Sequence, residues 1–145
     1  MALEHYLVLI GTKQERHEYT EAEDVLNGFL EKSSKFKDRR RLLREREIVI
    51  GRVGLCDVQV PDHFRHVSGY HGKLIKKEGE EGKIVYVFID LSSNGTDFYP
   101  TFSDYQGGKG PELLHKNTLS PRELRSGNVI SLGGQVDFAY ETLER

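Results

Sequence analysis

Short apolar segments with strand character, separated by glycine-containing turns, constrain the fold of this chain more than any other feature. The longest is IVYVFI at Ile84–Ile89, six apolar residues without a polar interruption, which is typical of a central strand buried on both faces. Similar patterns predict further strands over residues 6–10, 47–52, 58–60, 72–77, 129–132 and 136–140. Many short strands joined by turns indicate an all-β sandwich or barrel.

The sequence GEEG at 79–82 predicts a hairpin turn between two of these strands. Pairing outward from this turn sets His71 opposite Asp90, since partners on antiparallel strands are counted symmetrically from the turn. In this register residues 67–71 and 90–96 meet at the end of the sandwich that lies away from the turn.

Composition limits the classes of protein that this chain can belong to. Its 145 residues suit a single domain, 1–145, with a core large enough to need no disulfide. The one cysteine, Cys56, excludes an intramolecular disulfide and a multi-cysteine zinc site. With 21 basic and 23 acidic side chains and a net charge of -2, nucleic acid and membrane surfaces are poor partners.

No apolar segment reaches the length of a membrane span or of a signal peptide's apolar region. We therefore expect a cytoplasmic protein without a membrane partner. His63, His66 and His71 lack the regular spacing of metal ligands. We expect neither a metal nor another cofactor.

Two regions depart from the strand pattern. Residues 20–32 carry apolar side chains at helical spacing and predict a helix inside an insertion over 12–46. The basic part of this insertion, 32–46, fits either a patch for nucleic acid or an acidic partner, or a solvated surface, and the near-neutral total charge favours the surface. Residues 97–118 hold two prolines and three glycines and predict a long surface loop.

Polar and turn-forming residues converge at the end of the sandwich opposite the predicted turn. They come from three segments: Gly51 and Arg52, Ser68 and His71, and Ser93, Asn94 and Gly95. An arginine holds a phosphate with two parallel charge-assisted hydrogen bonds, and hydroxyls and amides bind the remaining oxygens. Each residue alone also suits an ordinary structural role, and for His71 a buried hydrogen-bonding role is the simpler one. Together they predict an anion-binding loop end.

In order and spacing these segments resemble the signature of the forkhead-associated (FHA) domain. The resemblance rests on four stretches, GR at 51–52, SGYH at 68–71, LSSNGT at 91–96 and LRSGNVISLGG at 124–134. It covers roughly residues 47–141 of the chain. It implies an FHA-like β-sandwich of two antiparallel sheets that binds phosphothreonine peptides with the loops at one end.

The resemblance also implies a role for each matching residue. Arg52 and Ser68 would contact the phosphate, Asn94 would hold the peptide backbone, and Ser93 would lie at the phosphate or its flank. The residues in supporting positions would be Gly51, His71, Gly95 and Thr96, with His71 bracing the binding loops.

Three departures from the family pattern separate this chain from its typical members. Gly69 stands where many members have arginine or asparagine. The insertion over 12–46 and the segment 97–118 are longer than usual, and DFYPTF replaces the usual continuation after Thr96. Because 97–118 borders the part of the site that often selects residues after the phosphothreonine, the peptide preference does not transfer.

Two other functions compete with phosphopeptide binding. Ser68, His71 and Asp90 supply the residue types of a hydrolase triad, but the G-x-S-x-G turn of such enzymes is absent. A phosphate-independent interaction scaffold on the same fold is the stronger alternative, since fold does not determine function. The sequence favours a non-catalytic module that binds a threonine-phosphorylated protein, the product of a Ser/Thr kinase.

Overall fold

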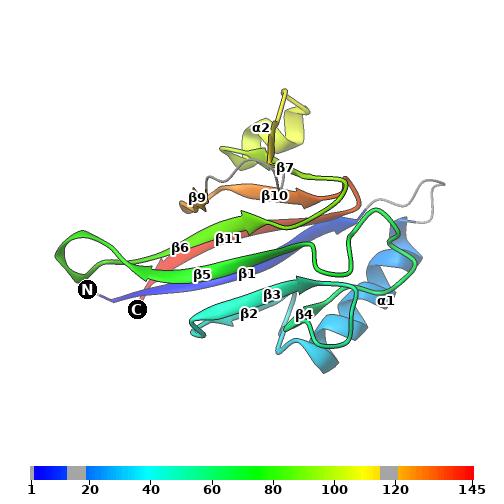
Figure 1. Ribbon diagram of the computed structural model, residues 1–145, viewed down its shortest axis with the longest axis horizontal. Coiled ribbons are helices and arrows are strands. Elements are labelled where there is room, and N and C mark those ends of the chain that lie inside the picture. Colours follow the sequence, from blue (N-terminus) through cyan, green and yellow to red (C-terminus); the bar gives the residue numbers. More distant parts are fainter. Residues whose placement is uncertain (1, 13–18, 115–120) are drawn as a thin grey trace.

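Strands make up most of the regular secondary structure, as the sequence predicts. A computed structural model describes residues 2–12, 19–114 and 121–145, with the backbone alone for 19–22 (Figure 1). In chain order its strands are β1 (Leu3–Thr12), β2 (Arg40–Leu43), β3 (Glu47–Gly51), β4 (Val58–Gln59), β5 (Gly72–Glu78), β6 (Ile84–Asp90), β7 (Thr96–Tyr99), β8 (Glu112–Leu114), β9 (Arg122–Glu123), β10 (Val129–Leu132) and β11 (Val136–Glu144).

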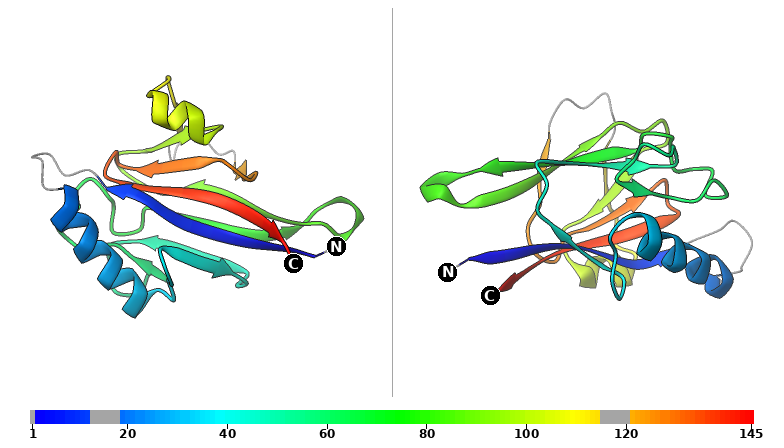
Figure 2. Two further views of the ribbon diagram at one scale, coloured as in Figure 1. Left: turned by 180° about the vertical axis from the view of Figure 1, so that it is seen from behind. Right: turned by 90° about the horizontal axis from the view of Figure 1, so that it is seen from below.

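These strands form two sheets that pack face to face (Figures 1 and 2). The six-stranded sheet has the order β2-β1-β11-β10-β7-β8, and the five-stranded sheet has the order β4-β3-β5-β6-β9. Neighbouring strands are antiparallel except β3 and β4, which are parallel. The two chain ends lie together where β1 begins and β11 ends (Figure 1). The predicted sandwich is confirmed.

The inner faces of the two sheets enclose one hydrophobic core. Leu7 and Phe138 of the six-stranded sheet, and Ile48, Leu74 and Phe88 of the five-stranded sheet, are almost fully buried. Burial of each such side chain contributes about 1.5–3 kcal/mol to the free energy of unfolding. Because alternate residues of every strand face this core, the core fixes the strand ends from which the loops emerge.

The β5–β6 hairpin corrects the predicted register by one residue. Gly72, not His71, pairs with Asp90. The turn is tighter than the sequence suggests, because a 3₁₀ turn at Glu80–Gly82 with a left-handed residue, Glu81 (φ 57°), closes it and leaves Glu78 in the strand. A one-residue shift exchanges the faces of a strand, so the outward and inward residues of β5 are decided by this turn.

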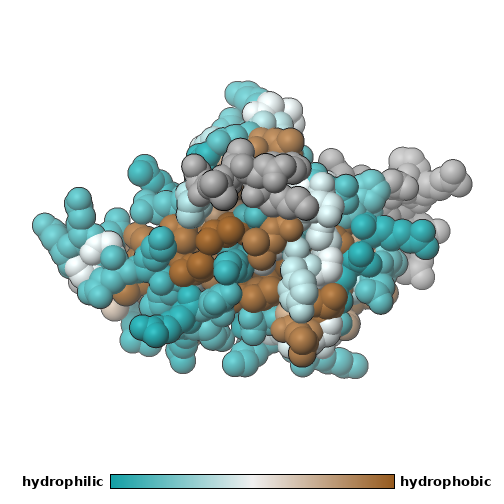
Figure 3. Space-filling view, viewed as in Figure 1, coloured by the Kyte–Doolittle hydropathy of each residue, from teal (hydrophilic) through white to brown (hydrophobic). Residues whose placement is uncertain are grey.

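The outer face of the five-stranded sheet is more apolar than a solvent-facing sheet requires. Val85 and Ile89 of β6 and Ile75 of β5 alternate with the core residues and are half-buried. Figure 3 shows apolar residues gathered over β5 and β6 on this side of the molecule. The prediction that the strand is buried on both faces therefore holds for Tyr86–Phe88 and not for Ile84, Val85 and Ile89, which are half-buried.

The predicted helix is present as α1 (Tyr19–Ser33), one residue longer at each end than the periodicity suggests. Leu26 and Leu30 are buried, and the helix packs beside β1 and β4. Ribbon views from behind and below show α1 at the side of the sandwich (Figure 2). The part of the insertion over 13–18 lies outside the described residues.

One arginine of the basic stretch 32–46 belongs to the interior and not to the surface. Arg41 is 3% exposed, and its guanidinium donates to the backbone carbonyls of Ser34 and Asp57 and pairs with Glu45 at 3.3 Å. A buried charge that lost these partners would destabilise the fold by several kcal/mol. Arg41 therefore ties the end of the insertion to the sandwich, a role that the charge pattern did not reveal.

The segment 97–118, predicted to be a long surface loop, is largely exposed in its described part but is not irregular. This part contains β7, a short helix α2 (Phe102–Gly107) and β8. Thr101 caps α2 by accepting a hydrogen bond from the Asp104 amide, and the Tyr105 hydroxyl donates to Asp137 of β11 at 2.6 Å. Residues 115–118 lie outside the described residues.

In the part of the chain that the structure describes, neither α1 nor α2 is long and apolar enough to cross a membrane.

Candidate functional site

Three loops meet at the end of the sandwich that lies away from the chain ends. The first loop, 52–57, joins β3 to β4, the second loop, 60–71, joins β4 to β5, and the third loop, 91–95, joins β6 to β7. The backbone amide of Arg52 donates to the carbonyl of Ser68 at 3.2 Å, which joins the first two loops.

Gly51 allows the first two loops to approach each other. A β-carbon at this position would lie 2.1 Å from the backbone oxygen of Gly69, closer than any side chain can come. Only glycine therefore fits at the exit of β3, and its small size places the next residue, Arg52, directly beside the second loop.

Arg52 projects from this junction with its terminal nitrogens available. Its Nε donates to the carbonyl of Val67, which orients the guanidinium, and its side chain is 30% exposed. The nearest carboxylate, Asp62, is 90% exposed and lies 3.8 Å away. Exposed pairs at such a distance are weak, so an incoming anion competes easily with Asp62 for this arginine.

The hydroxyl of Ser68 and the amide of Asn94 complete the group of candidate donors. Ser68 Oγ accepts a hydrogen bond from the backbone amide of Ser93 at 2.9 Å, so its own proton is free to point outward. Asn94 Nδ2 donates to the carbonyl of His66 at 3.1 Å, which fixes the plane of the amide. The contact of Ser93 with the second loop uses its backbone, and its side chain is exposed.

His71 lies beneath these donors, fully buried, and connects the second loop to the third. Its Nδ1 accepts from the backbone amide of Ser68 at 3.0 Å, and its Nε2 lies 3.1 Å from the carbonyl of Gly95 and 3.0 Å from the hydroxyl of Thr96. Burial lowers the pKa of His71 to about 4, although the Asp90 carboxylate acts in the opposite direction. The ring is neutral at physiological pH, with its proton on Nε2.

A buried hydrogen-bond network extends from His71 to Asp90. The Thr96 hydroxyl donates to Asp90 Oδ1 at 2.7 Å, and the Ser92 hydroxyl donates to the same carboxylate at 2.8 Å. Ser92 Oγ in turn accepts from the backbone amide of Gly95 at 2.8 Å. These directional bonds give the third loop a single conformation, because breaking one would leave a buried polar group unpaired.

Sequence reasoning selected Ser93 and missed Ser92, although the two are adjacent. Ser92 is the fully buried member of the pair and holds the turn, whereas Ser93 is exposed. The spacing Asp90-Leu91-Ser92 is the available signal, because a serine hydroxyl two residues after a strand-end aspartate can fold back onto its carboxylate.

The β10–β11 turn supports the loops from behind, a contribution that sequence reasoning also missed. Gln135 is buried, and its Oε1 accepts from the backbone amide of His66 at 2.7 Å. Gly133 donates its amide to the carbonyl of Gly95 at 3.1 Å. Gly95 itself has φ 86° and lies against Leu113, so it also requires glycine.

The described residues of the site offer an array of hydrogen-bond donors. An arginine, a hydroxyl and an amide come from adjacent loops that buried bonds hold in place. The described residues contain no group of three or more His, Cys, Asp or Glu side chains that could hold a metal ion. Such a set of fixed donors suits an oxyanion with several oxygens.

Comparison with known sequences identifies the family of this arrangement. The sequence profile of the FHA domain matches residues 48–133, more than half of the chain. The chain belongs to the FHA family. No curated protein sequence matches it.

Solved structures, FHA domains among them, share the fold. One similar structure is that of the yeast Pml1 splicing factor, described with its integration into the RES complex. The match covers 99% of this chain and 82% of the Pml1 chain, with 17% identity and a TM-score of 0.63. A structure from an analysis of phosphothreonine-dependent FHA interactions matches over 98% of both chains, with 20% identity and a TM-score of 0.53. The yeast Dun1 FHA domain, bound to a doubly phosphorylated peptide from Rad53, matches over 96% of this chain and 74% of its own, with 16% identity and a TM-score of 0.54.

Proposed function

We propose that this FHA domain binds phosphothreonine peptides of partner proteins through its three loops. The observation that carries the proposal is the set of donors of Arg52, Ser68 and Asn94 on neighbouring loops. Each of these side chains is already oriented by a hydrogen bond to another loop residue. Donors that are fixed before binding lose little entropy when the phosphate arrives.

Membership of the family and the described complexes support this proposal. One related FHA structure comes from a study of phosphothreonine-dependent interactions, and another holds a peptide with two phosphothreonines. A phosphate carries three acceptor oxygens and nearly two negative charges, which match an arginine together with neutral donors. The partner would be a protein phosphorylated by a Ser/Thr kinase, met in the cytoplasm.

The geometry of His71 favours a binding module over a hydrolase. Its Nδ1 accepts a backbone amide and its Nε2 proton points at Gly95 and Thr96, so neither nitrogen is free to take a proton from Ser68. A general base needs hydrogen-bond reach to the proton that it abstracts. We therefore infer that the domain binds phosphopeptides without catalysing a reaction.

Isothermal titration calorimetry with a degenerate phosphothreonine peptide library, followed by single peptides, tests the proposal. The chosen sequence is made in four forms, with threonine, phosphothreonine, phosphoserine or glutamate at the central position. We expect clear binding only of the phosphorylated forms, with phosphothreonine preferred, because a carboxylate has fewer oxygens and less charge.

Arg52 provides the matched variants for this titration. Arg52→Ala is expected to weaken phosphothreonine binding by about 2 kcal/mol or more, since charge-assisted hydrogen bonds are lost. Arg52→Lys is expected to restore it only in part, because an ammonium lacks the planar fork of a guanidinium. Equal binding of the threonine, phosphothreonine and glutamate forms would instead support a phosphate-independent scaffold.

A further inference from the structure

The opposite end of the sandwich, where the chain ends lie, contains a pocket of about 470 Å³ between the two sheets. The length of β6 separates this pocket from the three loops. Ile84, at the start of β6, lines the pocket, and Asp90, at its end, belongs to the hydrogen-bond network of the loops. Six residue steps of a strand span about 20 Å. The pocket is therefore distinct from the proposed phosphopeptide site, and its volume falls in the range of ligand sites.

Apolar and polar side chains share the walls of this pocket, and a buried pair forms its floor. Leu3 of β1, Ile84 of β6 and Leu124 after β9 supply apolar surface. His5 and Tyr140 are both buried, and the tyrosine hydroxyl is hydrogen-bonded to His5 Nδ1. Burial, with Lys76 nearby, lowers the pKa of His5, so this floor carries no charge at physiological pH.

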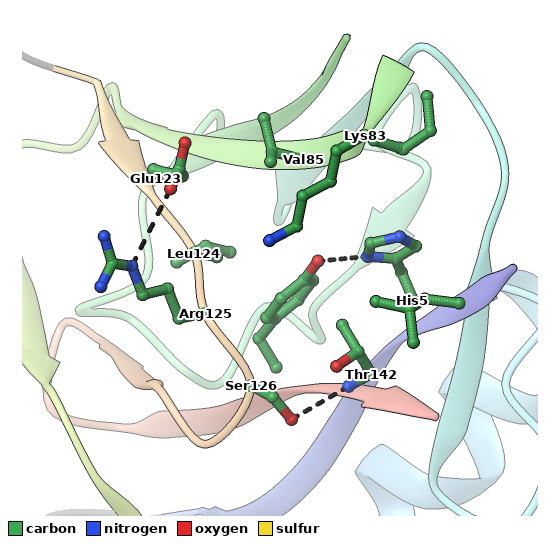
Figure 4. Close-up of a pocket in the computed structure, with 11 residues that line it drawn as sticks. His5, Lys83, Val85, Glu123, Leu124, Arg125, Ser126 and Thr142 are labelled. Atoms are coloured by element: carbon green, nitrogen blue, oxygen red, sulfur yellow. Dashed lines mark hydrogen bonds and ion pairs between the residues drawn. The ribbon is translucent and has the colours of Figure 1, made fainter. Parts of the chain in front are cut away.

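Lys83 supplies an uncompensated charge to the pocket. Figure 4 shows its side chain extending from the start of β6 toward the space between His5 and Leu124. The pocket also contains Glu123, but this carboxylate pairs with Arg125 at 3.9 Å. Among the residues that the structure describes, no carboxylate lies within ion-pair distance of Lys83.

A second pocket of about 190 Å³ continues the first across the end of the sandwich, since Leu3, His5 and Ile84 line both. Its far side carries Arg44 and Lys76, which have no ion-pair partner among the described residues, although Lys76 Nζ donates to the Arg44 carbonyl at 3.4 Å. Glu4, the carboxylate of this pocket, pairs with Arg145 at 3.7 Å. The two pockets form one groove, named here the terminal groove. It has apolar side chains in its walls, the uncharged His5–Tyr140 pair at its floor, and a cation without an ion-pair partner in the described chain at each end.

We propose that the terminal groove binds an extended partner segment that alternates acidic and apolar residues. Apolar side chains would enter between Leu3, Ile84 and Leu124, and carboxylates would pair with Lys83 at one end and with Arg44 and Lys76 at the other. The charge excess of the groove selects an acidic ligand. Its two joined pockets favour an extended chain over a single small molecule, which would fill only one of them. This inference does not depend on phosphate binding by the loops.

The test uses the whole chain, labelled with nitrogen-15, and a capped peptide that alternates glutamate and leucine. Titration followed by amide chemical shifts is expected to move the signals of residues that line the groove, such as Val85, Leu124 and Thr142, and to leave that of Ser68 unchanged. A capped peptide that alternates lysine and leucine serves as the charge control and is expected not to bind. Raising the salt concentration is expected to weaken binding of the acidic peptide, since salt screens exposed charges.

Charge-reversed variants locate the interaction. Lys83→Glu is expected to lower the affinity for the acidic peptide about fivefold or more, because a favourable surface ion pair is removed and a repulsive pair is added. Lys109→Glu, an exposed lysine after α2, is the matched control and should leave the affinity unchanged. Arg52→Ala should also leave it unchanged, which separates this site from the phosphate loops.

Several outcomes would overturn the inference. They are the absence of acidic-peptide binding at millimolar concentration, shifts confined to the three loops, equal binding of the lysine peptide, and equal losses for Lys83→Glu and Lys109→Glu. Hexanoate, a small carboxylate, is titrated separately to test whether the pocket binds a small organic acid. Shifts at Val85 with hexanoate, but none with the acidic peptide, would assign the pocket to a small organic acid and contradict the proposal.

Discussion

The two ends of the sandwich each bury one histidine, but they use it in different ways. At the loop end both ring nitrogens of His71 are bonded, to the second loop on one side and to the third loop on the other. At the terminal end His5 is bonded to a single side chain, that of Tyr140, and lies beneath an open groove. The loop-end histidine therefore joins two loops through backbone and side-chain groups, whereas the terminal-end histidine contacts one side chain.

This difference teaches what each end can recognise. A network that fixes the backbone of two loops holds donors in one geometry, which suits a ligand of one shape, such as a phosphate. Exposed cations on long side chains, such as Lys83, retain their rotamer freedom and provide charge without fixed geometry. Recognition at the loop end should depend on exact position, and recognition at the terminal end should depend mainly on net charge.

The largest expected effect follows from removing His71. His71→Ala should lower the free energy of unfolding by about 2–3 kcal/mol, because a cavity and unpaired buried groups remain, and should weaken phosphopeptide binding through loop disorder. His5→Ala should lower stability while the phosphopeptide affinity stays the same. Urea denaturation and calorimetry on both variants measure the two effects. Equal losses of phosphopeptide affinity would break the comparison.

The same variants decide between module and enzyme. Esterase and phosphatase assays on the wild type and on His71→Ala should show no activity in either protein. Turnover in the wild type that disappears in a normally stable His71→Ala protein would support the hydrolase instead.

A pH series sharpens the comparison with a slightly smaller effect. The pKa of His71 is 6.5 in an unfolded chain and about 4 in the fold. The unfolded chain therefore binds a proton first as the pH falls, and stability is lost between about pH 6.5 and about pH 4, with about 2 kcal/mol gone by about pH 5. Urea denaturation at successive pH values should show a shallower loss in His71→Gln. An identical slope in the two proteins would contradict the neutral, buried state of His71.

Gly51 tests how closely the loops must approach. Gly51→Ala places a β-carbon 2.1 Å from the Gly69 oxygen, so the second loop must shift. We expect a loss of about 1–2 kcal/mol of stability from overpacking and a phosphopeptide affinity reduced by about tenfold, since misplaced donors bind poorly. Gly110→Ala, where a β-carbon meets no atom within 4 Å, is the control and should change neither quantity. Binding that survives Gly51→Ala would show that the loops tolerate displacement.

The smallest effect concerns the carboxylate nearest to Arg52. Asp62→Asn removes a 90% exposed negative charge 3.8 Å from the guanidinium. Phosphopeptide affinity should rise by up to about fivefold, the range of an exposed ion pair, and the gain should shrink as salt is added. Glu31→Gln, an exposed charge on α1, controls for net charge and should have no comparable effect. A loss of affinity in Asp62→Asn would place this carboxylate among the residues that contact the peptide.

Local pattern and turn chemistry were enough to predict most of the strands, the helix α1 and the meeting of three polar segments at one end. They did not predict β2, β7, β8 or β9. Period-two and helical spacing are properties of neighbouring residues, so they are visible without a structure. Ser68 and Ser93 come from loops 25 residues apart, and the hydrogen bond between them shows that the segments do meet. The roles of Arg52 and Asn94 in binding remain predictions.

Only the tertiary structure decided the features that depend on small differences between close alternatives. The register of β5 with β6 depended on the conformation of one tight turn. Ser92 rather than Ser93 supplied the buried hydroxyl. β7, α2 and β8 formed within a segment rich in proline and glycine. In each case the local preference is nearly balanced. Burial against distant residues then selects the outcome, because an unpaired buried group or a misplaced apolar face costs more free energy than any local propensity supplies.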